Sequence, residues 1–82
     1  MIDVLYFAWV RERIGLPKEQ VETSAATVGA LVDELKAREE RYAAAFADLS
    51  ALRVAVDQDL TDFDAPLDGA REVAFFPPMT GG

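Results

Sequence analysis

The end of the chain, residues 77–82, offers chemistry through its backbone rather than through side chains. Gly82 presents an α-carboxylate, and because glycine has no Cβ, Gly81 and Gly82 can lie extended in a channel too narrow for a side chain. Two prolines precede this end, and they fix φ and remove backbone donors, so the segment cannot continue as helix or central strand. Fully extended, six residues reach roughly 20 Å. We therefore expect a tail that carries its terminal carboxylate into a pocket on a partner.

The remaining side chains offer little other chemistry. Cysteine and histidine are both absent, and Lys18 and Lys36 are the only side-chain amines. The sequence thus lacks a thiolate nucleophile, a side chain that titrates near pH 7 and the usual ligands of a structural zinc site. We expect no metal site, and a chain that supplies a substrate end rather than an active site.

Composition narrows the class of protein further. With 82 residues, 51% of them hydrophobic, the chain predicts one folded domain. A net charge of −7 disfavours nucleic acid as a ligand and favours encounter with basic protein surfaces, although a solvated surface explains the charge equally well. No apolar run approaches the ~20 residues of a membrane span, and no basic signal-peptide start is present. We expect a cytoplasmic protein with no membrane partner.

Hydrophobic periodicity predicts strands and helices in a definite order. Residues 2–9 are rich in β-branched and aromatic types and predict a strand, followed by a short helical turn at 10–14. Residues 18–23 predict a polar edge strand antiparallel to the first. Thr27 is a good N-cap for an amphipathic helix, and an alanine-rich second helix at 39–49 either continues it or bends away. Strands are expected at 52–56 and 71–76, with a brief strand or loop at 60–63 and turns between them.

This order predicts an α+β fold with a mixed sheet of four to five strands and one or two helices on one face. If the first and last strands lie side by side in the middle of the sheet, the fold is the ubiquitin-like β-grasp. We expect the β-grasp domain to span residues 1–76 and residues 77–82 to form an extended, flexible tail.

Four segments resemble the small, sulfur-carrying subunit of molybdopterin synthase. They are Val-Leu-Tyr-Phe-Ala-Trp-Val-Arg-Glu at 4–12, Thr-Val-Gly-Ala-Leu at 27–31, Asp-Ala-Pro-Leu-Asp-Gly at 64–69, and the ending Glu-Val-Ala-Phe-Phe-Pro-Pro-Met-Thr-Gly-Gly at 72–82. The ending is similar almost residue for residue. The resemblance implies membership of a family whose members carry sulfur for molybdenum cofactor biosynthesis.

The resemblance also implies a chemical route through Gly82. A ubiquitin-activating-like adenylyltransferase would use ATP to convert the carboxylate to an acyl-adenylate, and sulfur from a persulfide elsewhere would then leave a thiocarboxylate. The tail would enter the large subunit of molybdopterin synthase, within a heterotetramer, and give its sulfur to a cyclic pterin monophosphate. This chain would bind no cofactor itself; the adenylate and thiocarboxylate would be covalent states of its own C-terminus.

Adjacent phenylalanines near the tail predict a docking patch. Phe75 and Phe76 share a predicted strand and must point to opposite faces, and one helix layer covers only one of those faces. We expect Phe75 inward and Phe76 outward. Arg11 holds a partner carboxylate or is simply solvated. The resemblance implies that the partner-binding set is Phe7, Arg11, Leu60, Phe76, Pro77, Pro78, Met79 and Thr80.

Three alternatives remain open on the sequence. A protein modifier would join Gly82 to a target lysine through the same adenylate. A sulfur carrier for another pathway, such as thiazole synthesis, would use the same tail, although such carriers are usually shorter and lack the second helix. A pure interaction module would not need Gly81 and Gly82 at all.

Overall fold

The structure, a computed structural model, describes residues 1–78 of the chain. Its elements in chain order are β1 (Ile2–Tyr6), α1 (Ala8–Ile14), β2 (Lys18–Val21), α2 (Val28–Arg38), α3 (Glu40–Ala45), a 3₁₀ helix η1 (Leu49–Ala51), β3 (Arg53–Val56), β4 (Asp59–Thr61) and β5 (Glu72–Phe76).

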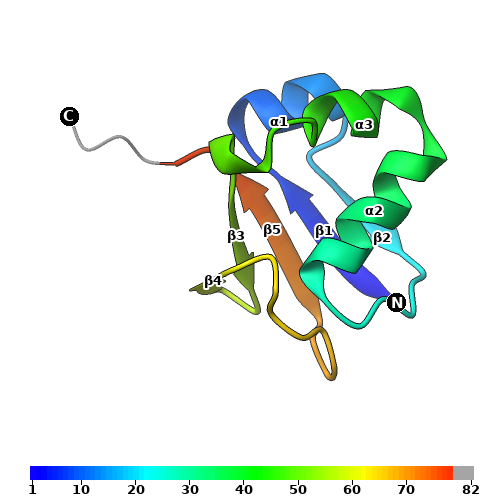
Figure 1. The fold of residues 1–82 in the computed structure, drawn as a ribbon, viewed down its shortest axis with the longest axis vertical. Coiled ribbons are helices and arrows are strands. Elements are labelled where there is room, and N and C mark those ends of the chain that lie inside the picture. The colour runs from blue at the N-terminus through cyan, green and yellow to red at the C-terminus, as the bar shows by residue number, and fades with distance from the viewer. Residues whose placement is uncertain (79–82) are drawn as a thin grey trace.

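The strands form one mixed sheet in the order β2-β1-β5-β3-β4. β1 and β5 run parallel in the middle, whereas the other neighbouring pairs are antiparallel. α2 and α3 lie over one face of the sheet, and α1 lies at the end toward which β1 and β5 run (Figure 1). The predicted β-grasp is thereby confirmed, with the first and last strands side by side.

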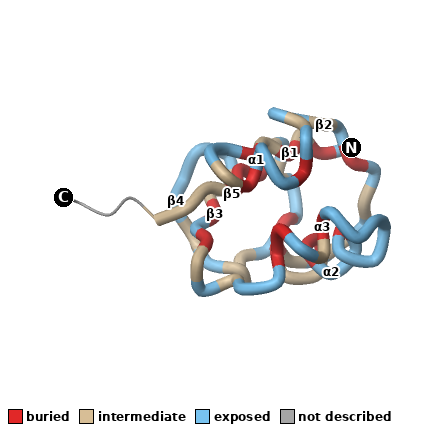
Figure 2. Tube along the Cα trace, turned by 90° about the horizontal axis from the view of Figure 1, so that it is seen from above, coloured by how far each residue is buried: buried red, intermediate tan, exposed pale blue. Residues whose placement is uncertain are grey.

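The core lies between the sheet and α2–α3. The apolar stripe expected on α2 is completely buried, and alternate residues of β1 and β5 face it. Phe75 is the centre of an aromatic cluster, with ring centroids 5.0 Å from Phe46, 6.3 Å from Tyr6 and 6.4 Å from Phe63. Buried segments of strands and helices face one another across this interior in Figure 2. Dense aromatic packing fixes the position of β5, from which the tail departs.

The start of α2 is held by its own cap and by a distant loop. Thr27 Oγ1 accepts from the Ala30 N–H at 3.1 Å, as predicted for an N-cap. The Gly29 N–H donates to the Phe63 carbonyl at 2.7 Å. A Cβ on Gly29 would lie 3.3 Å from that carbonyl oxygen, so glycine permits the close approach. The long connection from β4 to β5 is therefore anchored to the helix layer.

The second helix bends away from the first instead of continuing it. Glu39 adopts an extended conformation (φ −152°), which ends α2 and starts α3 at the next residue. Tyr42 and Phe46 are fully buried, as expected, and Leu49 is partly buried. The break lets the alanine-rich segment cover α1 and the upper part of the sheet (Figure 1).

The strand predicted at residues 2–9 was too long. β1 ends at Tyr6, Phe7 is the N-cap of α1, and Ala8 already belongs to that helix. The run of β-branched and aromatic residues favours a strand locally, but helix α1 buries Val10 and Ile14 completely, and this tertiary packing overrides the local preference. Gly15 ends α1 in the left-handed region (φ 89°), which glycine adopts without a Cβ penalty.

The predicted turn after β3 is a two-residue hairpin. Asp57 and Gln58 both have positive φ, and Val56 pairs with Asp59 across the turn. The Asp57 carboxylate accepts from the backbone N–H groups of Arg71 and Glu72 at 2.9 and 3.0 Å. The segment predicted as a strand or loop therefore includes a short edge strand, β4, which pairs with β3, and the Asp57 carboxylate ties the turn to the start of β5.

Candidate functional site

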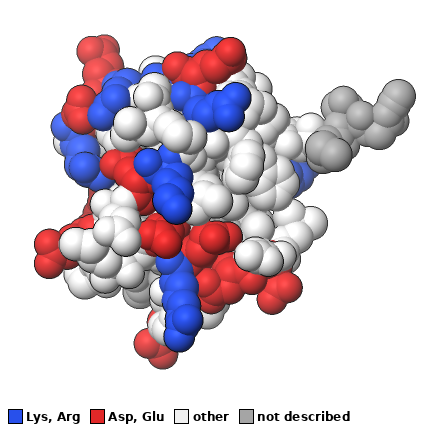
Figure 3. Space-filling model, turned by 180° about the vertical axis from the view of Figure 1, so that it is seen from behind, with Lys and Arg blue, Asp and Glu red and all other residues white. Residues whose placement is uncertain are grey.

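The face of the sheet opposite α2 and α3 carries a row of apolar side chains. Strand registers place Leu5, Ala74, Ala55 and Leu60 opposite one another across β1, β5, β3 and β4. In β1, β3 and β5 the neighbours of these residues face the core, because side chains alternate along a strand. Figure 3, which views the molecule from this side, shows an uncharged area with charged side chains gathered around its margins. An uncovered apolar sheet face is a candidate docking surface.

A shallow apolar hollow continues this row at the end of the sheet where the tail begins. It has a volume of about 370 Å³ and is lined by Phe7, Ala8, Ala74, Phe76 and Pro77. Phe7 is 44% exposed and Phe76 is partly exposed. The Phe7 N–H donates to the Phe75 carbonyl at 3.1 Å, which fixes Phe7 beside β5. The structure therefore brings together three of the residues assigned to partner binding.

Leu60 and Arg11, also assigned to partner binding, do not line this hollow. Leu60 is 70% exposed on edge strand β4, separated from β5 by β3. Arg11 is exposed on α1, one helical turn after Phe7, whose carbonyl accepts from the Arg11 N–H at 3.4 Å. Among residues 1–78, no carboxylate lies within ion-pair distance of Arg11. Both side chains are thus available to a partner, and their binding roles stay predictions.

The tail leaves directly from the hollow. Pro77 and Pro78 follow β5 and are partly buried. Met79, Thr80, Gly81 and Gly82, the other tail residues in the predicted site, lie outside the described part of the chain. The chemistry assigned to Gly82 is therefore a prediction from sequence, whereas the position from which the tail starts is a structural observation.

Two features of the site were not anticipated. Ala8, which lines the hollow, has its backbone in the left-handed region (φ 53°). This conformation is unusual for alanine, and no sequence pattern predicts it. Arg53 lies opposite Phe76 in the β3–β5 register, and its side chain is exposed. Because Arg53 alternates with buried Leu52 and Val54, its side chain falls on the uncovered face. Its position opposite Phe76 depends on the strand register, which the sequence does not reveal.

A hydrogen-bonded tyrosine pair holds the strand that leads to Phe7. The hydroxyls of Tyr6 and Tyr42 donate to Glu19 Oε2 at 2.8 and 2.6 Å. Burial raises the pKa of both tyrosines above its ordinary value, and the hydrogen bond to Glu19 raises it further. This network joins the end of β1 to β2 and α3, directly before Phe7.

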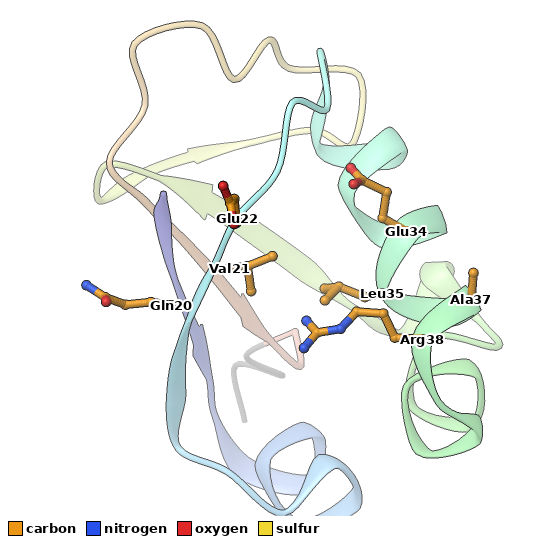
Figure 4. A pocket seen from close by; sticks show the side chains of 7 residues that line it. All are labelled: Gln20, Val21, Glu22, Glu34, Leu35, Ala37 and Arg38. Carbon is orange, nitrogen blue, oxygen red and sulfur yellow. The ribbon is translucent and has the colours of Figure 1, made fainter.

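A second hollow, of about 470 Å³, lies between β2 and α2 (Figure 4). Its lining residues are Gln20, Val21, Glu22, Glu34, Leu35, Ala37 and Arg38. Val21 and Leu35 are buried at its base, whereas Glu22, Glu34 and Arg38 are exposed around it. It shares no residue with the hollow beside the tail. Because none of its residues belongs to the predicted tail chemistry, we assign the functional site to the smaller hollow.

Within residues 1–78, no group of three or more His, Cys, Asp or Glu side chains is arranged to hold a metal ion. The helices of this part of the chain are too short or too polar to cross a lipid bilayer.

Comparison with known proteins agrees with the fold and shows the family. Residues 4–82 match the ThiS family. The chain is 48% identical over 82 residues to the molybdopterin synthase sulfur carrier subunit of Escherichia coli (strain K12), covering 100% of both chains. It is 38% identical, again over 100% of both chains, to the protein of the same description from Haemophilus influenzae. The crystal structure of SAMP1 from Haloferax volcanii superposes with a TM-score of 0.78 at 23% identity, covering 99% of this chain and 98% of that one; this likeness concerns the fold alone.

Proposed function

This chain belongs to the ThiS family and is a sulfur carrier of molybdenum cofactor biosynthesis, and we propose that the Gly82 carboxylate is the group that carries the sulfur. The observation that supports the role best is the 48% identity to a molybdopterin synthase sulfur carrier subunit along the whole of both chains. The family match extends through Gly82 itself. As a small subunit, the chain has a large synthase subunit as its partner.

We infer the chemistry from the groups that the chain possesses. A carboxylate is a poor acyl donor because its leaving group would be an oxide ion. Attack of a Gly82 carboxylate oxygen on the α-phosphate of ATP, in an activating partner, would form an acyl-adenylate and release pyrophosphate. The terminal sulfur of a donor persulfide would then attack the carbonyl carbon and release AMP, and a second thiol of the donor would cleave the acyl disulfide, leaving a thiocarboxylate on Gly82 and a disulfide on the donor. Because cysteine is absent from the sequence, no thiol side chain of this protein competes as the carrier.

The described residues would act by docking and by aiming the tail. β5 is anchored by the aromatic cluster around Phe75, so its end has a fixed position and direction. Pro77 and Pro78 have fixed φ and no N–H to donate, so neither can extend the ladder of β5. The hollow at Phe7 and Phe76 offers apolar surface at the place where a partner would receive the tail. A partner that covers this surface would hold the tail at the mouth of its active site.

Reconstitution with purified components tests this proposal. The assay combines the chain with an activating adenylyltransferase, ATP, a sulfur donor, the large synthase subunit and the cyclic pterin monophosphate, and it measures the dithiolene product. We expect that deleting Gly82, or adding one residue after it, abolishes product formation while the unfolding free energy is unchanged. Full activity of either variant would overturn the assignment to Gly82. Covalent ladders on target proteins, instead of product, would favour the protein-modifier alternative.

A further inference from the structure

The uncovered face of the sheet carries opposite charges at its two ends. At the tail end, Arg53 lies directly opposite Phe76 across β3 and β5. Its side chain is exposed, and one guanidinium nitrogen donates to the Leu52 carbonyl at 2.9 Å, which holds the guanidinium close to the sheet. A cation is thus fixed immediately beside the hollow from which the tail leaves.

The other end of the same face is acidic. Asp3 of β1 and Glu72 of β5 are direct neighbours in the parallel register, and both are partly exposed. Alternation puts them on the same side as Leu5 and Ala74, two positions further along each strand. Like charges opposite each other in a sheet disfavour the pairing unless an opposite charge comes between them or beside them.

Neither end is neutralised within the described chain. In residues 1–78 the ion pairs are Arg38 with Glu19 and Arg41 with Glu39, all of them away from this face. Between the two charged ends lies the apolar row, so the separation along the strands is four residues, or about 13 Å. Along β3, β5 and β1 the face therefore presents a cation, an apolar strip and an anionic pair in a fixed order, and exposed Lys18 of β2 lies opposite Leu5 at the side of the strip.

We propose that this order of charges determines the orientation in which the docking partner binds. The proposal rests on the function proposed above and names the chemistry of the surface that fits. The partner presents a carboxylate beside its tail channel, opposite Arg53, and a lysine or arginine opposite the Asp3–Glu72 pair, with apolar side chains between them. A partner docked in the reverse direction would bring like charges together, so the order fixes the direction in which the tail enters.

Charge reversal at each end tests the proposal. Binding of the full chain to the large synthase subunit is measured by calorimetry at about 0.05 M and about 1 M salt, where the Debye length falls severalfold. We expect Arg53→Glu and Glu72→Lys each to weaken binding about tenfold at low salt, with a smaller effect at high salt. Arg53→Gln, which removes the charge without reversing it, should weaken binding less.

Lys36→Glu is the matched control, because it makes the same charge change as Arg53→Glu at an exposed position on α2, away from this face. If Lys36→Glu binds as tightly as the wild type, the effect of Arg53→Glu is specific to its position. If Lys36→Glu weakens binding as much as Arg53→Glu does, the effect comes from the net charge of the chain, and the proposal is overturned. If the wild type binds and neither Arg53→Glu nor Glu72→Lys changes the affinity, this proposal alone is overturned. A wild-type chain that neither binds the large subunit nor receives sulfur would overturn the proposed function as well. Urea unfolding of each variant shows that the fold is intact.

Discussion

Phe75 and Phe76 are consecutive residues of β5 whose side chains lie on opposite faces of the sheet. Phe75 is completely buried among aromatic rings, whereas Phe76 is partly exposed and lines the hollow beside the tail. One residue anchors the strand and the next is available to a partner. This division of roles allows stability and docking to be separated by mutation.

Alanine at each of the two positions should therefore have different effects. We expect Phe75→Ala to lower the free energy of unfolding by about 3–5 kcal/mol, because it leaves a cavity in the core. Phe76→Ala should leave stability nearly unchanged and weaken binding to the large subunit by about 1–3 kcal/mol, as for an interface anchor. Urea unfolding and calorimetric titration measure the two quantities. If Phe76→Ala destabilised the chain as much as Phe75→Ala while binding stayed the same, Phe76 would be a core residue.

Ala8 should store backbone strain that glycine would relieve. Its φ of 53° is costly for a residue with a Cβ, and its side chain is exposed. We expect Ala8→Gly to raise the unfolding free energy by about 0.5–1 kcal/mol. Ala44→Gly, at an exposed position of α3, is the control and should lower it by about 1 kcal/mol. Equal losses at both positions in urea unfolding would show that Ala8 is not strained.

Stability should fall at alkaline pH because of Tyr6 and Tyr42. Burial and the bond to Glu19 raise the pKa of both tyrosines in the folded chain above the ordinary value of 10.0. Above that value the unfolded chain releases phenolic protons that the folded chain retains, so the unfolding free energy decreases as pH rises. The stabilising contribution is complete below pH 10 and is lost above it.

Tyr42→Phe separates the two contributions. We expect this variant to show about half the wild-type slope of unfolding free energy against pH between roughly 10 and 11.5. Urea unfolding across that range measures the slope. An unchanged slope would contradict a raised pKa for Tyr42 in the folded state.

Much of the fold was predictable from the sequence because local and tertiary preferences agree there. The apolar spacing on α2 and the cap at Thr27 each have one physical interpretation, and the structure confirms both. The extent of β1 was wrong because residues 7–9 are strand formers by type but are drawn into α1 by the burial of Val10. That choice depends on contacts with residues distant in sequence.

The candidate site was predictable only in part. Alternation along β5 was sufficient to place Phe76 on the uncovered face, because it needs no knowledge of neighbouring strands. Arg53 and the Asp3–Glu72 pair depend on strand register, which brings together residues far apart in the chain. The left-handed Ala8 arises from the turn between β1 and α1, and alanine gives no sign of it.

The most direct test of the account is the mass of the C-terminal peptide of chain produced together with its activating enzyme and a sulfur donor. We predict that the peptide ending at Gly82 gains the mass difference between one sulfur and one oxygen atom, and that the gain disappears when ATP or the activating enzyme is omitted. An unmodified terminus under conditions where molybdopterin is made, or sulfur found at any other position of the chain, would contradict the claim that Gly82 is the carrier.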